Sequence, residues 1–183
     1  MNLKLISSFH GYDIIKRPFV DNLWGKNVQE LFQSATILHF VSDWLREKAL
    51  SLGAPEEKTK VIYAGVDTHF FSPNIIKNEI DPKNLIRIVS TGRLVPLKGY
   101  EYAFRAIKPL CDKYTKIEYI IIGDGNDSQR LKTLVKDLSI TQNVRLVGKK
   151  SKVEVRDILG TADLYLHPST TEALGGALLE ACA

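Results

Sequence analysis

The sequence has little cysteine and no long apolar run, and each absence excludes a class of protein. Its 183 residues include 2 cysteines, Cys111 and Cys182, and both fall in apolar, helical surroundings where a small core side chain fits. Cysteines placed in this way do not make a disulfide framework, so the sequence favours a reducing, cytoplasmic compartment. No window approaches the ~20 consecutive apolar residues of a membrane-spanning helix. The first residues, MNLKLISSFHGYDI, also lack the apolar run and cleavage site of a signal peptide.

Several motifs for charged ligands are missing as well. The sequence has no Walker phosphate-binding loop, and it has no Asp-x-Asp pair to hold a metal ion on a sugar nucleotide, because Asp124 and Asp127 are three positions apart. We therefore expect no metal and no other cofactor. The 25 basic and 21 acidic residues give a net charge of +4, which suits a phosphate-rich ligand or an anionic membrane surface. The basic residues are not densely patterned, so nucleic acid is not an expected partner.

The apolar residues that are present follow strand and helix patterns in two regions. They make up 44% of the chain, which is enough for a packed core. In the first region we expect helices at 24–34 and 42–52, and the second of these is capped by Ser42 and ended by Gly53. The strands of this region are expected at 3–9, 37–41 and 60–63. In the second region the alternation of strands with helices is regular, and it predicts parallel pairing with right-handed crossovers.

A change of pattern separates the two regions. Prolines, asparagines and an aspartate interrupt it, and neither a helical nor an alternating period survives. We interpret residues 73–84 as a linker between domains at 1–72 and 85–183, and we expect limited proteolysis to cut there first. The aromatic residues Phe70 and Phe71 are expected to hold the linker against one of the domains.

The second region predicts four strands, each followed by a helix, and the last strand is expected to be short and buried. The strands are placed at 86–90, 117–122, 144–147 and 162–166. The apolar face of the first helix is formed by Ala103, Phe104, Ile107, Leu110 and Cys111, and that of the second by Leu131, Leu134, Val135 and Leu138. Pro109 should kink the first helix or end it early. Ser151 and Glu154 predict a capping box at the start of the third helix.

Two carboxylates follow the last predicted strand. Glu172 is expected on the loop at the carboxyl end of the strand, and Glu180 inside the helix that follows. Between them, Gly175 and Gly176 let backbone amides approach a ligand at the positive end of that helix. Such a site would suit a diphosphate flanked by two polyols, with one carboxylate for each set of hydroxyls. Two solvated surface glutamates are the alternative.

Cations and a histidine stand at the ends of two other predicted strands. Gly92, Arg93 and Lys98 belong to the loop TGRLVPLKG after the first strand of the second region. Two cations five apart on a glycine-bounded loop at the carboxyl edge of a sheet make a clamp for a diphosphate, and a pair of solvated surface charges is the alternative. His10 follows the first strand of the whole chain. It lies where open α/β sheets bind ligands, although a histidine that only completes a turn would look the same.

The sequence Gly123-Asp124-Gly125 follows an isoleucine-rich strand and suggests a dinucleotide site. A full fingerprint needs a third glycine, but its position holds Ser128. No acidic residue closes a second strand ~20 residues further on, as NAD binding would prefer. An NAD-type oxidoreductase therefore rests on two glycines alone, and a test of nicotinamide binding would separate it from other functions.

Considered together, these motifs resemble those of a family of glycosyltransferases. The segment EALGGALLE from Glu172 to Glu180, preceded by Pro-Ser, is similar to the Glu-x7-Glu signature of retaining family 4 enzymes of the GT-B type. The Arg-x4-Lys spacing of Arg93 and Lys98 and the sequence Ile-Ile-Gly-Asp-Gly match the same family. Ala173 departs from it, because the family usually has glycine there. The resemblance covers nearly the whole chain and is closest to enzymes that build colanic acid and other extracellular polysaccharides.

The resemblance implies an α/β fold of the GT-B type. It comprises part of an N-terminal Rossmann-like domain at 1–72 and most of a C-terminal Rossmann-like domain with a parallel sheet at 85–183. The implied reaction transfers a sugar from a nucleoside-diphosphate sugar to a growing polysaccharide or lipid-linked acceptor, with retention and without a cofactor. The chain would be a fragment of such an enzyme and inactive alone. We expect it in the cytoplasm, with peripheral contact at the inner membrane face.

The resemblance also assigns roles to individual residues. Glu180 would bind the ribose, and Arg93 and Lys98 would hold the diphosphate. His10 and Glu172 would contact the donor sugar. The remaining substrate-binding positions would be Gly92, the backbone amides of Leu174, Gly175 and Gly176, and a nucleobase loop at 148–153. Two other functions stay open at this point: a non-catalytic module that binds sugar nucleotides, and the NAD-type oxidoreductase.

Overall fold

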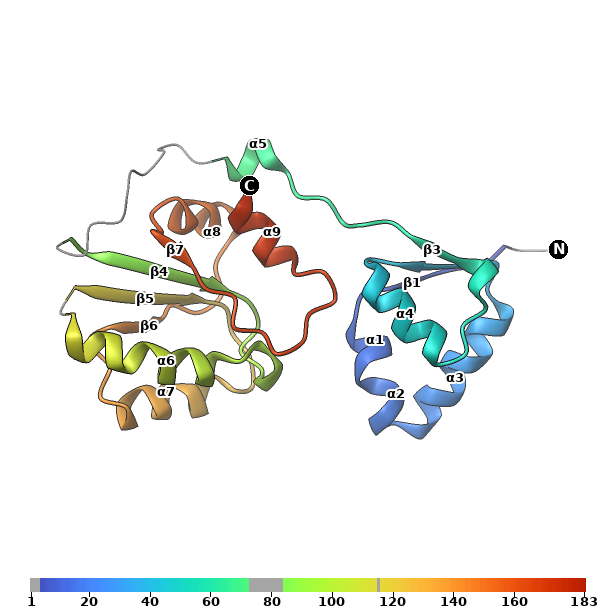
Figure 1. The fold of residues 1–183 in the computed structure, drawn as a ribbon, viewed down its shortest axis with the longest axis horizontal. Helices are drawn as coiled ribbons and strands as arrows, with labels where there is room; N and C mark the ends of the chain where they lie inside the picture. Colours follow the sequence, from blue (N-terminus) through green and yellow to red (C-terminus); the bar gives the residue numbers. More distant parts are fainter. Residues whose placement is uncertain (1–3, 73–83, 115) are drawn as a thin grey trace. The chain divides into compact units, whose positions relative to one another are not determined.

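The structure is a computed structural model that describes residues 4–72, 84–114 and 116–183. The chain divides into two compact units, and each is described by itself (Figure 1). Unit 1 comprises Met1–Gly65 and Glu172–Gly176, and unit 2 comprises Val66–Thr171 and Ala177–Ala183. Nearly all of the predicted linker at 73–84 lies outside the described residues, so the division into domains at that place stays a prediction.

Unit 1 is built on a three-stranded parallel sheet in the order β1-β2-β3. Its strands are β1 (Ile6–Phe9), β2 (Ile37–Phe40) and β3 (Thr59–Val61). Its helices are α1 (Tyr12–Ile15), α2 (Arg17–Val20), α3 (Asn22–Ser34) and α4 (Asp43–Ser51), and a 3-10 turn spans Glu56–Lys58. The parallel pairing agrees with the Rossmann-like domain that the resemblance implies for 1–72, whereas the short helices α1 and α2 were not predicted.

The core of unit 1 forms where α3 and α4 pack on this sheet. Phe9 of β1 stacks on Phe40 of β2 with ring centroids 5.1 Å apart, and Phe32 of α3 meets Phe9 edge to face at 5.9 Å. The Asp21 side chain caps α3 by accepting a hydrogen bond from the amide of Trp24. The side chain of Ser42 caps α4 as predicted, and it satisfies an amide that the first turn of a helix leaves without a partner.

Unit 2 is built on a four-stranded parallel sheet in the order β6-β5-β4-β7. Its strands are β4 (Ile86–Thr91), β5 (Ile117–Ile122), β6 (Val144–Leu146) and β7 (Leu164–Tyr165). Its helices are α5 (Thr68–Phe71), α6 (Tyr100–Lys113), α7 (Ser128–Asp137), α8 (Lys152–Leu159) and α9 (Gly176–Cys182), and a 3-10 turn spans Pro96–Lys98. The order of the strands places the first strand of the unit, β4, inside the sheet.

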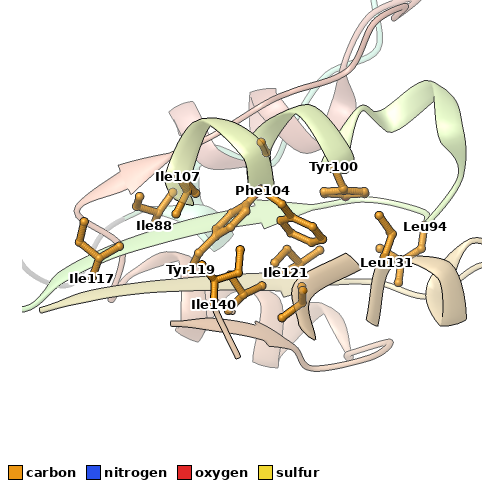
Figure 2. Packing of buried hydrophobic residues seen from close by; sticks show 13 residues of the cluster. Ile88, Leu94, Tyr100, Phe104, Ile107, Ile117, Tyr119, Ile121, Leu131 and Ile140 are labelled. Atoms are coloured by element: carbon orange, nitrogen blue, oxygen red, sulfur yellow. The ribbon is translucent and has the colours of Figure 1, made fainter. Parts of the chain in front are cut away.

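Helices cover both faces of this sheet (Figure 1). Helices α6 and α7 pack on one face, where Phe104 and Tyr119 meet edge to face with centroids 6.1 Å apart (Figure 2). Helix α8 packs on the other face against Val89, Ile120 and Ile122. Fully burying a side chain such as Phe104 contributes about 1.5–3 kcal/mol. Strand β5 is therefore buried on both sides, which explains its isoleucine-rich sequence.

Helix α5 is fixed to unit 2 by its aromatic residues. The Lys152 ammonium lies 4.8 Å from the ring centroid of Phe70, and the Arg156 guanidinium lies 4.9 Å from the same centroid. Phe71 is buried. The expectation that Phe70 and Phe71 hold this part of the chain against one domain is confirmed, and the contact is with α8.

Three local expectations in unit 2 were wrong. Strand β7 is not buried, because it is an edge strand with one neighbour and Leu164 is 46% exposed. Cys182 is exposed at the end of α9, where no described element covers it, and only Cys111 packs against a core. Leu110, which was expected on the apolar face of α6, is 43% exposed. Helix α6 continues past Pro109 to Lys113, so Pro109 does not end it early, and the alternative of a kink stays a prediction.

No helix within residues 4–72, 84–114 and 116–183 combines the length and the apolar character that crossing a bilayer requires.

Candidate functional site

A pocket of about 410 Å³ opens at the carboxyl ends of three strands of unit 2. Thr91 ends β4 and Ile122 ends β5, while Lys149 follows β6 in the next loop. Because parallel strands bring their carboxyl ends to one edge, side chains far apart in the sequence meet there. The full lining consists of Thr91, Gly92, Arg93, Ile122, Gly123, Asp124, Lys149, Lys150, Val155, Ala177 and Glu180.

The glycines of this pocket allow its loops to pack closely. Gly123 has φ 145°, and a Cβ atom built on it would lie 1.9 Å from the carbonyl oxygen of Gly92. A Cβ atom on Gly125 would lie 2.3 Å from the carbonyl oxygen of Leu94. Any side chain would therefore push the loop after β5 away from the loop after β4. Loop packing alone explains the Gly-x-Gly sequence, without a dinucleotide.

Backbone hydrogen bonds join the same loops into one rim. The amide of Gly92 donates to the carbonyl of Ile122 at 2.9 Å, and the amide of Leu94 donates to the carbonyl of Asp124 at 3.0 Å. The amide of Gly123 donates to the carbonyl of Gly148 at 2.9 Å. These bonds satisfy the polar groups of loops that leave the ladder of the sheet. They also fix the position of Arg93 relative to the loop after β6.

Charged side chains dominate the mouth of the pocket. Arg93 and Lys149 are exposed and Glu180 is half-buried. Within the part of the chain that the structure describes, no hydrogen bond or ion pair engages these three side chains. Lys150 lies 3.1 Å from Glu154 and thus has an acidic partner. Charged groups that converge on a hollow without partners are typical of a site for a charged ligand.

Lys98 lies beside this pocket, not in its lining. Its side chain runs along Gly92, because a Cβ atom on Gly92 would lie 3.7 Å from the Lys98 Cε atom. Gly99 follows with φ +67°, and a Cβ atom there would lie 2.0 Å from the carbonyl oxygen of Pro168. The Thr170 amide donates to the carbonyl of Leu97 at 2.9 Å. The segment after β7 therefore packs against the turn that carries Lys98.

A set of buried hydroxyl groups supports β4 below the pocket. The Thr91 and Tyr165 hydroxyls lie 3.0 Å apart, and those of Ser90 and Tyr119 lie 2.7 Å apart. Burial raises the pKa of the Tyr119 hydroxyl, so this group stays protonated and neutral. The end of β4 is thereby joined to both of its neighbours, β5 and β7. The sequence motifs do not reveal these contacts.

His10 follows β1 in unit 1 and belongs to a chain of polar contacts. The Ser8 hydroxyl lies 3.2 Å from His10 Nε2 and 2.7 Å from His39 Nδ1, and His39 Nε2 lies 2.9 Å from the carbonyl oxygen of Ile62. A carbonyl only accepts, so His39 Nε2 donates and its Nδ1 accepts from Ser8. The Ser8 oxygen is then available to accept from His10 Nε2. The Asp13 carboxylate accepts from the amide of Gly11 at 2.7 Å and shapes the turn.

The segment Glu172–Gly176 groups with unit 1. Its residues Ala173 and Leu174 pack against the core of that unit. A Cβ atom on Gly11 would lie 3.1 Å from the Cβ atom of Ala173. The methyl group of Ala173, the departure from the family pattern, is thus accommodated because residue 11 has no side chain.

The structure brings some of the predicted site residues together and keeps others in a separate unit. Gly92, Arg93 and Glu180 line the pocket of unit 2, and the expected loop at 148–153 contributes Lys149 and Lys150. His10, Glu172, Leu174 and Gly175 belong to unit 1, together with Gly176, the first residue of α9. Sequence reasoning missed Thr91 and Asp124 as lining residues, although each stands at or just after the end of a strand.

Two further observations concern metal ligands and a second hollow. Among the described residues, no three His, Cys, Asp or Glu side chains form a group that could hold a metal ion. A larger hollow of about 900 Å³, lined by Arg87, Ile120 and Arg145 among others, has Lys150 of the loop at 148–153 as its one predicted site residue. The pocket at the carboxyl edge is therefore the candidate site.

Comparison with known proteins places the chain in a family. Residues 71–183 match the family described as glycosyl transferases group 1. WcaL of Escherichia coli (strain K12), named as a colanic acid biosynthesis glycosyltransferase, is 33% identical over 186 residues, which cover 98% of this chain and 45% of that protein. AmsK of Erwinia amylovora, named as an amylovoran biosynthesis glycosyltransferase, is also 33% identical with the same coverage. The chain spans less than half the length of these relatives.

Solved structures show the same fold. HepE from Anabaena, in complex with UDP-glucose, has a TM-score of 0.80 at 20% identity over 97% of this chain and 50% of that chain. Sucrose-phosphate synthase from Thermosynechococcus elongatus has a TM-score of 0.80 at 17% identity over 99% of this chain and 48% of that chain. The fold is therefore α/β of the GT-B type, as the sequence predicted.

The chain belongs to the glycosyl transferases group 1 family. Neither the NAD-type oxidoreductase nor the non-catalytic module is favoured by these comparisons.

Proposed function

We propose that this chain is the donor-binding part of a family 4 glycosyltransferase that transfers a sugar, with retention, from a nucleoside-diphosphate sugar. One observation carries the proposal: Arg93, Lys149 and Glu180 converge on one pocket, and no described residue engages them. Two cations at the carboxyl edge of a parallel sheet suit a diphosphate, and a carboxylate in the same pocket suits a ribose diol. HepE, which has the same fold, was solved with UDP-glucose.

The cations would act by stabilising the departing diphosphate. Negative charge grows on the leaving group as the bond to the sugar breaks, and cations fixed beforehand stabilise that charge without reorganising. Arg93 stands on a loop that backbone hydrogen bonds hold in place, and Lys98 runs along Gly92 next to it. The proposal needs no metal ion, because these side chains supply the positive charge.

The sugar end of the donor is assigned to residues of the other unit. His10 and Glu172 would contact the donor sugar, with His10 oriented through Ser8 and His39. The backbone amides of Leu174, Gly175 and Gly176 would complete the contacts. The acceptor is proposed to be a growing polysaccharide or a lipid-linked saccharide, because WcaL and AmsK are named for the biosynthesis of such polymers.

The first test measures UDP binding to the 183-residue chain by calorimetry. Each charge-assisted contact contributes about 1.5–3 kcal/mol, so Arg93→Ala combined with Lys98→Ala should lower UDP affinity by about a hundredfold or more. The matched control is Lys132→Ala with Lys136→Ala, which removes equal charge from the exposed face of α7. If both double variants bind UDP as the wild type does, the phosphate site lies elsewhere.

A second test separates the ribose contact from the phosphate contact. Glu180→Gln should weaken UDP binding about tenfold, since a charged acceptor becomes a neutral one, and it should leave binding of inorganic pyrophosphate unchanged. Glu172→Gln is the control, because Glu172 is assigned to the donor sugar, which UDP lacks. Equal losses for UDP and pyrophosphate in the Glu180 variant would contradict a role at the ribose.

A further inference from the structure

Helix α2 and the first turn of α3 expose three large apolar side chains within five consecutive residues. Phe19 is 68% exposed, Val20 is 65% exposed and Leu23 is 68% exposed. In Figure 1, the turn from α2 into α3 lies at the end of unit 1 away from its strands. Single exposed apolar residues are ordinary, but three large ones this close in the chain are a candidate interaction surface.

The fold holds these three side chains outside by close packing behind them. A Cβ atom on Gly25 would lie 3.1 Å from the carbonyl oxygen of Pro18, so the backbone of α2 rests directly on α3. Val28 and Phe32 fill the inner face of α3. Trp24 donates its indole N–H to the carbonyl of Asp13 at 3.1 Å. The inner positions are thus occupied, and Leu23, one residue before Trp24, is directed to the other side.

The charges around the three apolar side chains are mostly positive. Lys16, Arg17 and Lys26 are exposed, and the Arg17 guanidinium lies 3.9 Å above the ring of Trp24. The two nearby carboxylates are only partly exposed and accept hydrogen bonds from backbone amides. Asp13 accepts from Gly11 at 2.7 Å, and Asp21 accepts from Trp24 at 3.0 Å. A partner therefore meets an apolar centre with cations at its border.

We propose that this surface, formed by residues 16–26, docks on a membrane bilayer that contains anionic lipids. Exposed apolar side chains can enter the boundary between headgroups and acyl chains without the chain spanning the bilayer. Lysine and arginine extend their apolar stems along that boundary and place their charges among the headgroup phosphates. The surface combines both features, and the net charge of +4 favours the same partner. Docking here does not depend on the assignment of the nucleotide pocket.

Vesicle co-sedimentation of the 183-residue chain tests the proposal. The wild type should bind vesicles of phosphatidylcholine with one third phosphatidylglycerol, and it should bind pure phosphatidylcholine at least tenfold more weakly. Each cation near an anionic surface contributes about a fivefold factor, so Lys16→Glu with Lys26→Glu should reduce binding to the anionic vesicles by more than twentyfold. Replacing Phe19, Val20 and Leu23 by serine should abolish it.

Matched controls keep the result specific. Lys132→Glu with Lys136→Glu makes the same charge change on α7, and Tyr102→Ser with Val153→Ser removes apolar side chains that are 65% and 49% exposed in unit 2. Both controls should bind as the wild type does, and circular dichroism checks that all variants fold. The proposal would be overturned if the wild-type protein bound neither vesicle type. It would also be overturned if the controls lost as much binding as the variants of the proposed surface. Light scattering would also overturn it if the wild type were a dimer and the serine variant a monomer. The surface would then join two copies of the chain.

Discussion

Gly99 and Gly123 stand where a carbonyl oxygen from another segment occupies the space that a side chain would need. The oxygen lies 2.0 Å from the Cβ position at Gly99 and 1.9 Å from that at Gly123. In both places the crowding atom is backbone, which cannot move aside as a side chain can. These residues therefore set how closely the loops around the pocket approach each other, and they act through geometry alone.

A pair of alanine substitutions separates this crowding from backbone strain. Gly99 and Gly148 both have a positive φ, of 67° and 75°, but a Cβ atom at Gly148 meets nothing within 4 Å. Gly148→Ala should lower the free energy of unfolding by about 1 kcal/mol, the cost of the left-handed conformation. Gly99→Ala should lower the free energy of unfolding by about 2 kcal/mol more than Gly148→Ala does, because the segment at Pro168 must shift. Urea unfolding followed by fluorescence measures both, and equal losses would contradict the clash.

Helix α8 connects the stability of unit 2 to its pocket at the scale of an element. The predicted capping box is confirmed: the Ser151 hydroxyl accepts from the Glu154 amide at 3.3 Å, and the Glu154 carboxylate accepts from the Ser151 amide at 2.9 Å. The same carboxylate holds Lys150, which lines the pocket. The backbone hydrogen bond from Ser151, assisted by its hydroxyl and by Lys150, lowers the pKa of Glu154 to about 2.

This pKa predicts a pH dependence of stability. A carboxyl whose pKa is lower in the folded protein stabilises it above the unfolded pKa of 4.5, and this contribution is lost as pH falls from about 4.5 to about 2. Glu154→Gln should therefore flatten the fall of melting temperature across that window. Asp137→Asn on α7, which removes one carboxylate outside the cap, is the control. A Glu154→Gln profile parallel to the wild type would contradict the cap.

Ser151 tests the other half of the same cap. Ser151→Ala removes the N-cap oxygen and should cost about 1 kcal/mol in the free energy of unfolding at neutral pH. Thr133→Ala in the middle of α7 is the control, because the Thr133 hydroxyl bonds only the carbonyl of Gln129 within its own helix. Equal destabilisation by the two substitutions would argue against a special role of the cap.

At the scale of the whole molecule, the two units are built from different sheets and contribute different groups. Every residue that lines the candidate pocket belongs to unit 2, whereas the three exposed apolar side chains of α2 and α3 belong to unit 1. The proposed donor site and the proposed membrane surface can therefore be removed by separate substitutions. An experiment can therefore contradict the proposed donor site without contradicting the proposed membrane surface, and the reverse.

Ligand linkage predicts where UDP stabilises the chain. UDP at a hundred times its dissociation constant should add about 2.7 kcal/mol to the stability of the unit that binds it. Hydrogen exchange should then slow in β4, β5 and β6, and exchange in β1, β2 and β3 should stay unchanged. Measurement by mass spectrometry on peptides from each sheet decides this. Slowing confined to β1–β3 would contradict the position of the pocket.

The sequence alone determined the features that depend on local spacing. The alternation of strands with helices predicted the parallel sheet of unit 2, and the caps at Ser42 and Ser151 were visible as single residues and spacings. The motifs at Arg93 and Glu180 predicted two residues that line the candidate pocket, because strands that alternate with helices bring their carboxyl ends to one edge of the sheet. These inferences needed only the near neighbours of each residue.

Tertiary structure decided what depends on distant neighbours. The exposure of Leu164 and Cys182 could not be inferred from their apolar neighbours in the sequence, because it depends on which elements lie over β7 and α9. The grouping of Ala173 with Gly11, and of Lys149 with Arg93, joins residues more than fifty positions apart. A periodic pattern shows which face of an element is apolar, but only the assembled fold shows what covers that face and which side chains are left to meet a ligand.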